Sequence, residues 1–212
     1  MSNIPHNLHR IWVAGSGPMP AEYEEYGKTW RDLNPGWDYY EWHSFPYWGT
    51  NPKQFADAET FSEQSDVLRY EVINHFGGVY IDTDFEAFVP ISDLIDTSPH
   101  DFIACPEYTT NNYVHYAAGF FAASPFHPLL EQIIRDMPAS IEANDTPATR
   151  AGPTYLQSIL HKHEGEFAVV PAELFYPYHG GEVWDHSQHP NAIAAHHWAA
   201  SWRKPNRSLY GT

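Results

Sequence analysis

The sequence predicts an α/β fold built on a mostly parallel sheet, because short apolar runs alternate along the chain with segments of helical periodicity. Residues 9–13 form an apolar run that ends near Gly15, which is typical of a buried strand. Apolar and aromatic residues recur at helical spacing over 23–33, and another apolar run covers 79–81. In such sheets ligands bind beyond the carboxyl ends of the strands, so the residues that follow these strands are the first candidates for a site.

The first predicted helix ends at Asn34-Pro35-Gly36, because this tripeptide combines residues that stop helices. Aromatic and polar residues alternate over 37–42 and predict a second strand. Residues 46–61 are rich in Pro, Gly and Asn, so they predict a loop with room for a short helix.

The next helix is predicted to begin at a capping serine, either Ser62 or Ser65. Gly77-Gly78 supplies its C-terminal stop, and the strand over 79–81 follows. Its buried face is predicted to consist of Leu68, Val72, Ile73 and Phe76.

The second half of the chain repeats the alternation of strands and helices. Strands are predicted over 102–105, 120–123 and 167–170, and helices over 128–137 and 152–161. The Pro-, Gly- and polar-rich segments 138–149 and 176–191 predict long loops.

Composition argues against several classes of function. The net charge of −16 argues against DNA, RNA or anionic lipid as partners, because binding a polyanion requires clustered Lys and Arg. The single cysteine, Cys105, excludes an internal disulfide and a thiolate zinc site. The chain shows no signal peptide, and no apolar run approaches the roughly 20 residues that span a bilayer. We therefore predict a single soluble, cytoplasmic domain over residues 1–212 with no transmembrane segment.

Two aspartates, Asp82 and Asp84, follow the predicted strand over 79–81. Side chains two residues apart in an extended segment point the same way, so both carboxylates converge at the end of the strand. Convergent carboxylates form a hard-oxygen site for Mn²⁺ or Mg²⁺, and such a metal holds a diphosphate. The alternative is a turn or helix cap, since Asp-x-Asp pairs are frequent.

Asp66 and Arg69 lie three residues apart on one face of the preceding predicted helix. By themselves they predict an intrahelical ion pair worth about 0.2–0.5 kcal/mol. Because the helix leads directly into the strand that carries Asp82 and Asp84, we expect all four side chains to lie close together. This arrangement indicates sugar transfer from a nucleotide sugar.

These residues form a pattern that resembles glycosyltransferase family 32. The central motif reads Ser65-Asp66-x-x-Arg69-Tyr70, then Gly77-Gly78-Val79-Tyr80-x-Asp82-x-Asp84. The likeness extends to His9-Arg10-Ile11-Trp12-Val13-x-Gly15, to Ala151-Gly152-Pro153-x-Tyr155-Leu156 and to His196-His197-Trp198-Ala199-Ala200-Ser201-Trp202. The family includes capsular-polysaccharide glycosyltransferases and initiating mannosyltransferases, and it is distantly similar to the glucosyltransferase domains of the clostridial toxins.

The resemblance implies a GT-A fold, a Rossmann-like sheet with helices on both faces. It implies that Asp84 ligates Mn²⁺ and that Asp82 contacts the metal, the ribose or the sugar. Asp66 would bind hydroxyls of the transferred sugar, and Arg69 the sugar or the diphosphate. Trp12 matches the position whose ring stacks on the nucleotide base, although a core tryptophan is nearly as good an interpretation.

At the C-terminus the resemblance implies a third metal ligand, His196 or His197, of which His196 fits the His-x-Trp spacing better. Ser201 and Trp202 are expected to meet the metal and the β-phosphate. A final strand with an aromatic plug is the alternative. The family commonly has Gly where Ala200 stands here, a small-for-small change.

The predicted activity is metal-dependent, retaining transfer of a hexose from UDP- or GDP-hexose to a glycan or other hydroxyl acceptor. Two alternatives remain open. A Mg²⁺-dependent phosphohydrolase also uses Asp-x-Asp, but its motif lies near the N-terminus and has Thr or Gly after the second Asp, where this chain has Phe85. A non-catalytic glycan-binding module built from aromatic and acidic residues is the other.

Overall fold

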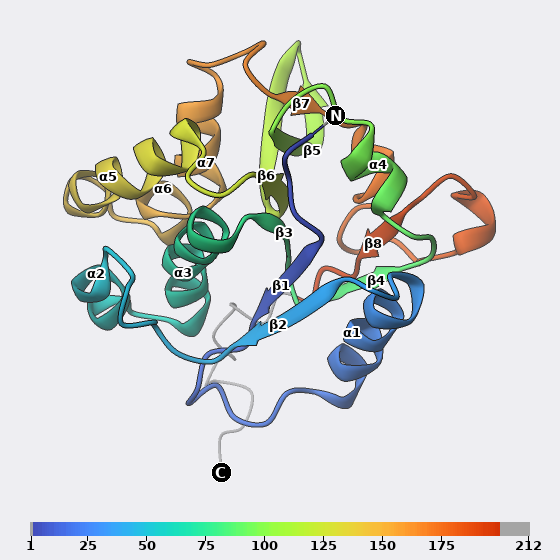
Figure 1. The fold of residues 1–212 in the computed structure, drawn as a ribbon, viewed down its shortest axis with the longest axis horizontal. Helices are drawn as coiled ribbons and strands as arrows, with labels where there is room; N and C mark the ends of the chain where they lie inside the picture. The colour runs from blue at the N-terminus through green and yellow to red at the C-terminus, as the bar shows by residue number, and fades with distance from the viewer. Residues whose placement is uncertain (1, 200–212) are drawn as a thin grey trace.

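The computed structural model describes residues 2–199 and has a six-stranded sheet at its centre (Figure 1). The strand order is β2-β1-β3-β6-β5-β7. The pairs β1–β2, β1–β3 and β5–β7 are parallel, whereas β6 runs antiparallel to both β3 and β5. The strands are β1 (Asn7–Ile11), β2 (Asp38–Trp42), β3 (Gly78–Ile81), β5 (Phe102–Thr110), β6 (Tyr113–Ala123) and β7 (Ala168–Val169). A separate antiparallel pair joins β4 (Phe85–Ala87) to β8 (Ala194–His196).

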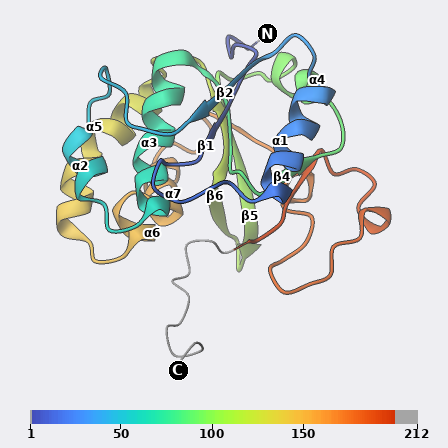
Figure 2. The same ribbon diagram turned by 90° about the horizontal axis from the view of Figure 1, so that it is seen from below.

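Helices cover both faces of the sheet, as Figure 2 shows, and each face has its own hydrophobic core. One layer contains α2 (Pro52–Asp57), α3 (Phe61–Phe76), α5 (Pro128–Ala143), α6 (Pro147–Arg150) and α7 (Pro153–Leu160). The opposite layer contains α1 (Ala21–Leu33) and α4 (Ser92–Asp96), and short 3₁₀ turns cover Ala172–Leu174 and His186–Gln188. The predicted fold class, with helices on both faces of a mostly parallel sheet, is confirmed.

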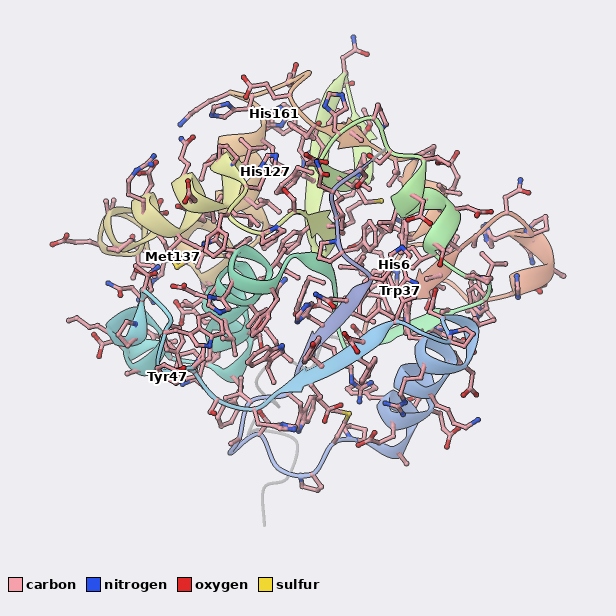
Figure 3. The ribbon with its side chains drawn as sticks, viewed as in Figure 1. His6, Trp37, Tyr47, His127, Met137 and His161 are labelled. Carbon is pink, nitrogen blue, oxygen red and sulfur yellow. The ribbon has the colours of Figure 1, made fainter. Side chains whose placement is uncertain are left out.

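The rings of His6 and Trp37 stack on each other where the two parallel strands β1 and β2 begin. His6 lies just before β1 and stacks on Trp37, which lies just before β2, with ring centroids 4.4 Å apart (Figure 3). Within β1, the fully buried His9 hydrogen-bonds the Gly77 carbonyl through Nε2 at 3.0 Å and accepts from the Trp42 indole N–H at 3.1 Å. His9 thereby ties β1 to β2 and to the turn before β3.

Burial lowers the pKa of His9 to about 4, although its bond to Gly77 raises it slightly. As the pH falls below about 6.5, His9 is protonated in the unfolded chain but stays neutral in the folded protein. The contribution of His9 to the free energy of unfolding is therefore complete above this pH and decreases as the pH falls toward 4. At pH 5 the stability advantage of the wild type over His9→Gln is expected to be about 2 kcal/mol smaller than at pH 7.5. Urea unfolding of both proteins measures it, and an equal advantage at the two pH values would contradict the buried neutral imidazole.

The prediction of a loop over 138–149 is wrong, because α5 continues through Pro138 to Ala143 and α6 follows. Proline lacks the N–H that would bond the carbonyl of Ile134, one turn earlier. That carbonyl instead accepts a hydrogen bond of 3.0 Å from the side-chain amide of Asn51. Asn51 is itself buried and held by Glu71, so a contact from a distant loop replaces the bond that proline removes.

The prediction that Ser62 or Ser65 caps α3 is also wrong. Thr60 is the N-cap, and its hydroxyl accepts from the backbone N–H of Glu63 at 3.1 Å. The Glu63 carboxylate in turn accepts from the backbone N–H of Glu59 at 2.8 Å, which resembles the reciprocal bonding of a capping box. The predicted stop at Gly77 is confirmed, since Gly77 ends α3 in a left-handed conformation with φ 63°.

Strands β5 and β6 are longer than predicted and form a long hairpin with its turn at Asn111-Asn112. The short pair β4–β8 was not predicted, and neither was α4. Over residues 2–199, no helix combines the length and the apolar character needed to cross a bilayer.

Candidate active site

The Asp82–Asp84 turn lies at the carboxyl end of β3, where it connects the central sheet to the short β4–β8 pair. The backbone N–H of Asp82 donates to the Gly119 carbonyl of β6 at 2.9 Å, which extends the β3–β6 ladder by one bond. Phe85 starts β4 directly after the turn and pairs with His196 of β8. This pairing places His196, which lies far along the chain, beside the Asp-x-Asp turn.

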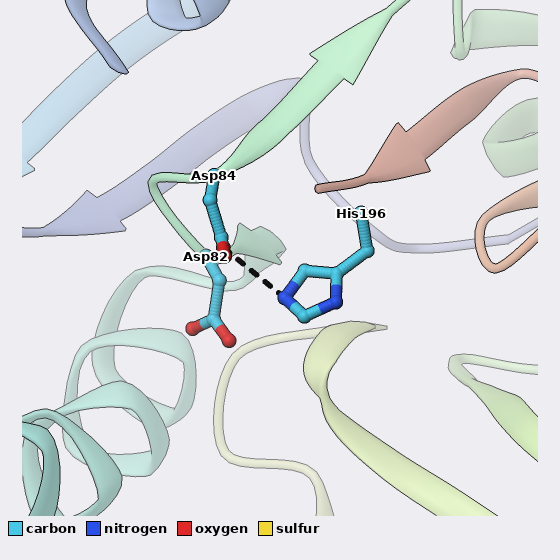
Figure 4. Close-up of side chains that lie close together, drawn as sticks. All are labelled: Asp82, Asp84 and His196. Atoms are coloured by element: carbon cyan, nitrogen blue, oxygen red, sulfur yellow. Dashed lines mark ion pairs between the residues drawn. The ribbon is translucent and has the colours of Figure 1, made fainter. Parts of the chain in front are cut away.

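The structure brings Asp82, Asp84 and His196 together, with one ligand atom from each within 4.8 Å of the others (Figure 4). Nε2 of His196 lies 3.1 Å from Oδ1 of Asp84, and the backbone N–H of Ala199 donates to Oδ2 of Asp84 at 3.0 Å. Burial by itself raises the pKa of Asp84, but the bond and charge of His196 outweigh it, so this pKa lies below its usual range. The same contact raises the pKa of His196 against the effect of burial.

The donor set of this cluster fits a divalent cation. Two carboxylates and one imidazole are ligands that Mn²⁺ accepts, and Mg²⁺ takes the carboxylates. Nε2 of His196 is the ring nitrogen that faces the carboxylates, so it is the atom that would bind the cation, whereas Nδ1 lies on the side of the ring away from Asp84 (Figure 4).

His197, the alternative metal ligand, points elsewhere and has both ring nitrogens occupied. Its Nε2 lies 3.0 Å from a Glu86 carboxylate oxygen, and its Nδ1 lies 3.0 Å from the Tyr178 hydroxyl. Its ring also stacks on Tyr26, with centroids 4.5 Å apart. These contacts anchor the end of β8, which favours His196 over His197 as the residue that faces the cluster.

Asp66 and Arg69 lie on α3 beside the Asp-x-Asp turn and are both almost fully buried. Nη2 of Arg69 is 2.9 Å from Oδ1 of Asp66 and 3.5 Å from Oδ1 of Asp82. Arg69 also donates to the backbone carbonyl of Ala118 at 2.7 Å, and the Tyr80 hydroxyl donates to Asp82 at 2.6 Å. The guanidinium therefore connects the helix to the Asp-x-Asp turn, in the proximity that the sequence predicts.

The carboxyl of Asp66 is poised between its two protonation states. Burial raises its pKa to about 7 in spite of the neighbouring Arg69, and the negative charges of Asp82 and Glu63 add to the rise. A Cβ atom on Gly152 would lie 3.1 Å from Oδ2 of Asp66, so the glycine lets the start of α7 pack against this carboxyl. Asp66 is thus covered by the Gly152–Pro153 segment, which belongs to the motifs that carry the family likeness.

Trp12 follows β1 at the same edge of the sheet and is half-buried rather than a core residue. Its indole N–H donates to the Gly17 carbonyl at 2.9 Å, and its ring meets the edge of Tyr23 with centroids 5.8 Å apart. Strands β1 and β3 are parallel neighbours with His9 paired to Tyr80, so Trp12 and the Asp-x-Asp turn follow their strands at the same edge of the sheet. Ser201 and Trp202 lie outside the described residues.

Several residues of this region were not predicted as site residues. The Tyr176 hydroxyl lies beside Gly119, next to Asp82, and Glu107 lies on β5 within electrostatic range of His196. Glu86 orients His197. Glu107 reaches the site through the β5–β6 hairpin, Glu86 through the β4–β8 pair, and Tyr176 through the segment that follows the 3₁₀ turn Ala172–Leu174. Short-range sequence patterns predict none of these pairings.

Comparison with known proteins supports the same chemistry. Residues 20–101 match the model of the glycosyltransferase sugar-binding region containing a DXD motif. The chain is 25% identical to inositol phosphoceramide mannosyltransferase 1 of Schizosaccharomyces pombe, over 99% of this chain and 66% of the relative. It is 23% identical to an uncharacterized glycosyltransferase of Acanthamoeba polyphaga mimivirus, over 63% of this chain and 55% of that protein. The chain thus spans less than two thirds of the length of these relatives.

Among solved structures, the chain resembles a glycosyltransferase involved in glycosylation of the major capsid of PBCV-1. The TM-score is 0.57 at 15% identity, over 92% of this chain and 95% of that one. This likeness shows a shared GT-A fold. The comparisons confirm the predicted resemblance, and they favour a glycosyltransferase over the phosphohydrolase and the non-catalytic module.

Proposed function

This chain carries the sugar-binding region of the DXD glycosyltransferases on a GT-A fold, and from that premise we propose that it is a metal-dependent, retaining hexosyltransferase. A hexose would pass from UDP- or GDP-hexose to the hydroxyl of a glycan or another acceptor. The observation that carries the proposal is the convergence of Asp82, Asp84 and His196 within 4.8 Å, beside the buried Asp66–Arg69 pair. Residues 1–212 are proposed to act as one domain.

The chain's own groups suit the charges that develop during transfer. Asp84, His196 and Asp82 would hold Mn²⁺ or Mg²⁺, which when bound neutralises the diphosphate leaving group. Arg69 is fixed by Asp66 and the Ala118 carbonyl, so its guanidinium is available as a preorganised cationic donor at the same place. Asp66 would accept hydrogen bonds from hydroxyls of the transferred sugar, the Ser201 hydroxyl would contact the metal, and the Trp202 indole N–H would contact the β-phosphate.

We assign retention of configuration to attack from the front face of the sugar. The bond from C1 to the phosphate oxygen breaks, the bond from C1 to the acceptor oxygen forms, and the acceptor's proton passes to the leaving phosphate oxygen. We assign no covalent nucleophile to this site, because its carboxylates have other partners. Asp66 is paired with Arg69 at 2.9 Å, and the Asp82 and Asp84 carboxylates converge with His196 on the candidate metal site. Mass spectrometry of the enzyme quenched during turnover tests this, because a covalent glycosyl adduct would overturn it.

The direct test of the proposed function is hydrolysis of a panel of nucleotide sugars without an acceptor. Wild-type protein with Mn²⁺ is expected to release UDP or GDP from at least one donor, and addition of EDTA is expected to stop the release. The likeness to a mannosyltransferase puts mannose first among the sugars to test. Release of inorganic phosphate from simple phosphate esters, with no attack on nucleotide sugars, would instead support a phosphohydrolase.

Trp12 is proposed to stack on the base of the nucleotide, because its half-buried ring lies at the same edge as Asp84. Trp12→Ala is expected to weaken nucleotide binding by about 1–3 kcal/mol, the worth of one aromatic–base stack. Isothermal titration with UDP and GDP in the presence of Mn²⁺ measures this loss. An unchanged affinity together with a large fall in thermal stability would show that Trp12 is a structural residue.

A further inference from the structure

The β5–β6 hairpin forms a wall along one side of the candidate active site. Phe120 of β6 pairs with Ile81 at the end of β3, and the next bond joins Gly119 to Asp82. The hairpin then continues past this edge through residues 113–118 of β6 and their partners on β5. No further β3 residue pairs with that extension in the described part of the chain, so it projects beyond the sheet at the level of the Asp-x-Asp turn.

A buried hydroxyl faces the base of this wall. Tyr176 is only 5% exposed, and among the described residues its hydroxyl has no hydrogen-bond partner. A Cβ atom on Gly119 would lie 3.1 Å from this hydroxyl and 2.7 Å from Oδ2 of Asp82. The glycine thus lets a polar tyrosine tip and a carboxylate of the cluster approach the hairpin backbone.

Glu107 stands above Tyr176 on the same wall. Pro106 pairs with Tyr116 and Tyr108 with His115, so Glu107 is the extra residue of a β-bulge. Bulges re-aim side chains and are frequent beside active sites. Burial raises the pKa of Glu107, and the nearby His196, His179 and His115 oppose the rise. The carboxylate is half-buried and makes no hydrogen bond to any residue within 2–199, although it lies among these imidazoles.

Half-exposed aromatic rings continue the wall outward from Glu107. Tyr108 stacks on His115 with centroids 4.2 Å apart, and Tyr113 meets the edge of the same imidazole at 5.0 Å. Tyr108 and Tyr113 are 37% and 45% exposed. A buried hydroxyl, a carboxylate and flat amphipathic rings therefore follow one another from the Asp-x-Asp turn to the surface.

We propose that this wall is the acceptor subsite and that the acceptor is a saccharide. The Tyr108 ring covers the apolar C–H face of the acceptor sugar, while the Glu107 carboxylate binds its hydroxyls. The inference rests on the proposed function and deepens it, because it names the class of acceptor and the residues that hold it.

The chemistry of the wall favours a saccharide over other acceptors. Sugars combine apolar C–H faces with hydroxyl donors, and an aromatic ring beside a carboxylate satisfies both. A lipid chain requires an aliphatic groove, whereas the exposed side of the wall carries Tyr108, Tyr113, His115 and Glu107. The net charge of −16 disfavours a polyanion.

Saturation-transfer NMR with methyl glycosides of mannose, glucose and galactose, in the presence of Mn²⁺ and UDP or GDP, tests the inference. The wild type is expected to bind at least one glycoside, and Tyr108→Ala and Glu107→Gln are each expected to weaken that binding at least fivefold. Tyr47→Ala and Glu25→Gln are matched controls, because Tyr47 is fully exposed between β2 and α2 and Glu25 is exposed on α1. Both controls are expected to bind like the wild type.

Two outcomes would overturn the inference: a wild type that binds none of the glycosides, or binding that Tyr108→Ala and Glu107→Gln leave unchanged. Affinity for the nucleotide, measured on the same samples, shows that each variant is folded. The donor-hydrolysis assay separates this inference from the proposed function. If the wild type hydrolyses a nucleotide sugar but binds no glycoside, only the acceptor subsite is overturned. If the wild type binds a glycoside, both variants lose that binding and no nucleotide sugar is hydrolysed, only the proposed transferase function is overturned.

Discussion

Asp84→Asn is expected to lower metal-dependent sugar transfer by at least about 10³-fold, equivalent to about 4 kcal/mol of transition-state stabilisation. The amide keeps the size of the carboxylate and an oxygen that can accept from the Ala199 N–H, so the fold should survive. The negative charge that balances His196, and that a divalent cation requires, is lost. Steady-state release of UDP or GDP at several Mn²⁺ concentrations measures the effect. Near-normal turnover of this variant would contradict the proposed metal site.

Glu86→Gln is the control for this prediction. Asp84 also anchors the end of β8 through Ala199, so its removal could act by loosening this segment rather than by removing a ligand. Glu86 anchors the same segment through His197 without facing the cluster. Glu86→Gln is therefore expected to cost only a few-fold in rate and to leave the dependence on Mn²⁺ concentration unchanged. A loss equal to that of Asp84→Asn would assign the effect to the anchoring of β8.

The part of the site that sequence predicts well is local. Asp66 and Arg69 share a helix that Gly77 stops, and the strand that follows ends at Ile81, directly before Asp82. Helical spacing, a glycine with positive φ and the period of two of an extended strand are enough to place these side chains together. His196 was found only through its likeness to a family motif, because pairing of β8 with β4 brings it across more than a hundred residues.

The features that sequence patterns missed depend on distant partners. Pro138 predicts a helix end, but the helix continues because Asn51 bonds the carbonyl that the proline leaves free. Glu107 and Tyr176 carry no motif, and the β-bulge and the Gly119 contact that place them arise only when the hairpin forms. Local propensity contains no information on such contacts, so a site wall made by non-local pairing is invisible until the fold is known.

Arg69→Met is expected to lower the free energy of unfolding by about 3–5 kcal/mol, because it leaves buried carboxylates without their cation. Arg69 is 5% exposed, and its guanidinium contacts Asp66, Asp82 and the Ala118 carbonyl at once. In the wild type the pKa of Asp66 is about 7, and loss of the Arg69 charge raises it further. At low pH the Asp66 carboxyl is therefore neutral, and the absence of its cation destabilises the fold less. The loss measured by urea unfolding should therefore be larger at pH 8 than at pH 5, and a loss independent of pH would contradict the pairing.

The double variant Asp66→Asn/Arg69→Met separates the structural from the catalytic part of this pair. Removing the Asp66 carboxylate together with its cation leaves fewer uncompensated buried charges, so part of the stability lost in Arg69→Met should return. Sugar transfer should not return, because the cationic donor to the diphosphate and the charged acceptor for the sugar hydroxyls are both absent. Arg69→Lys should also remain poorly active, since one ammonium cannot reach Asp66, Asp82 and Ala118 together as the planar guanidinium does. Recovery of activity in step with stability would show that Arg69 acts only by holding α3 against the Asp-x-Asp turn.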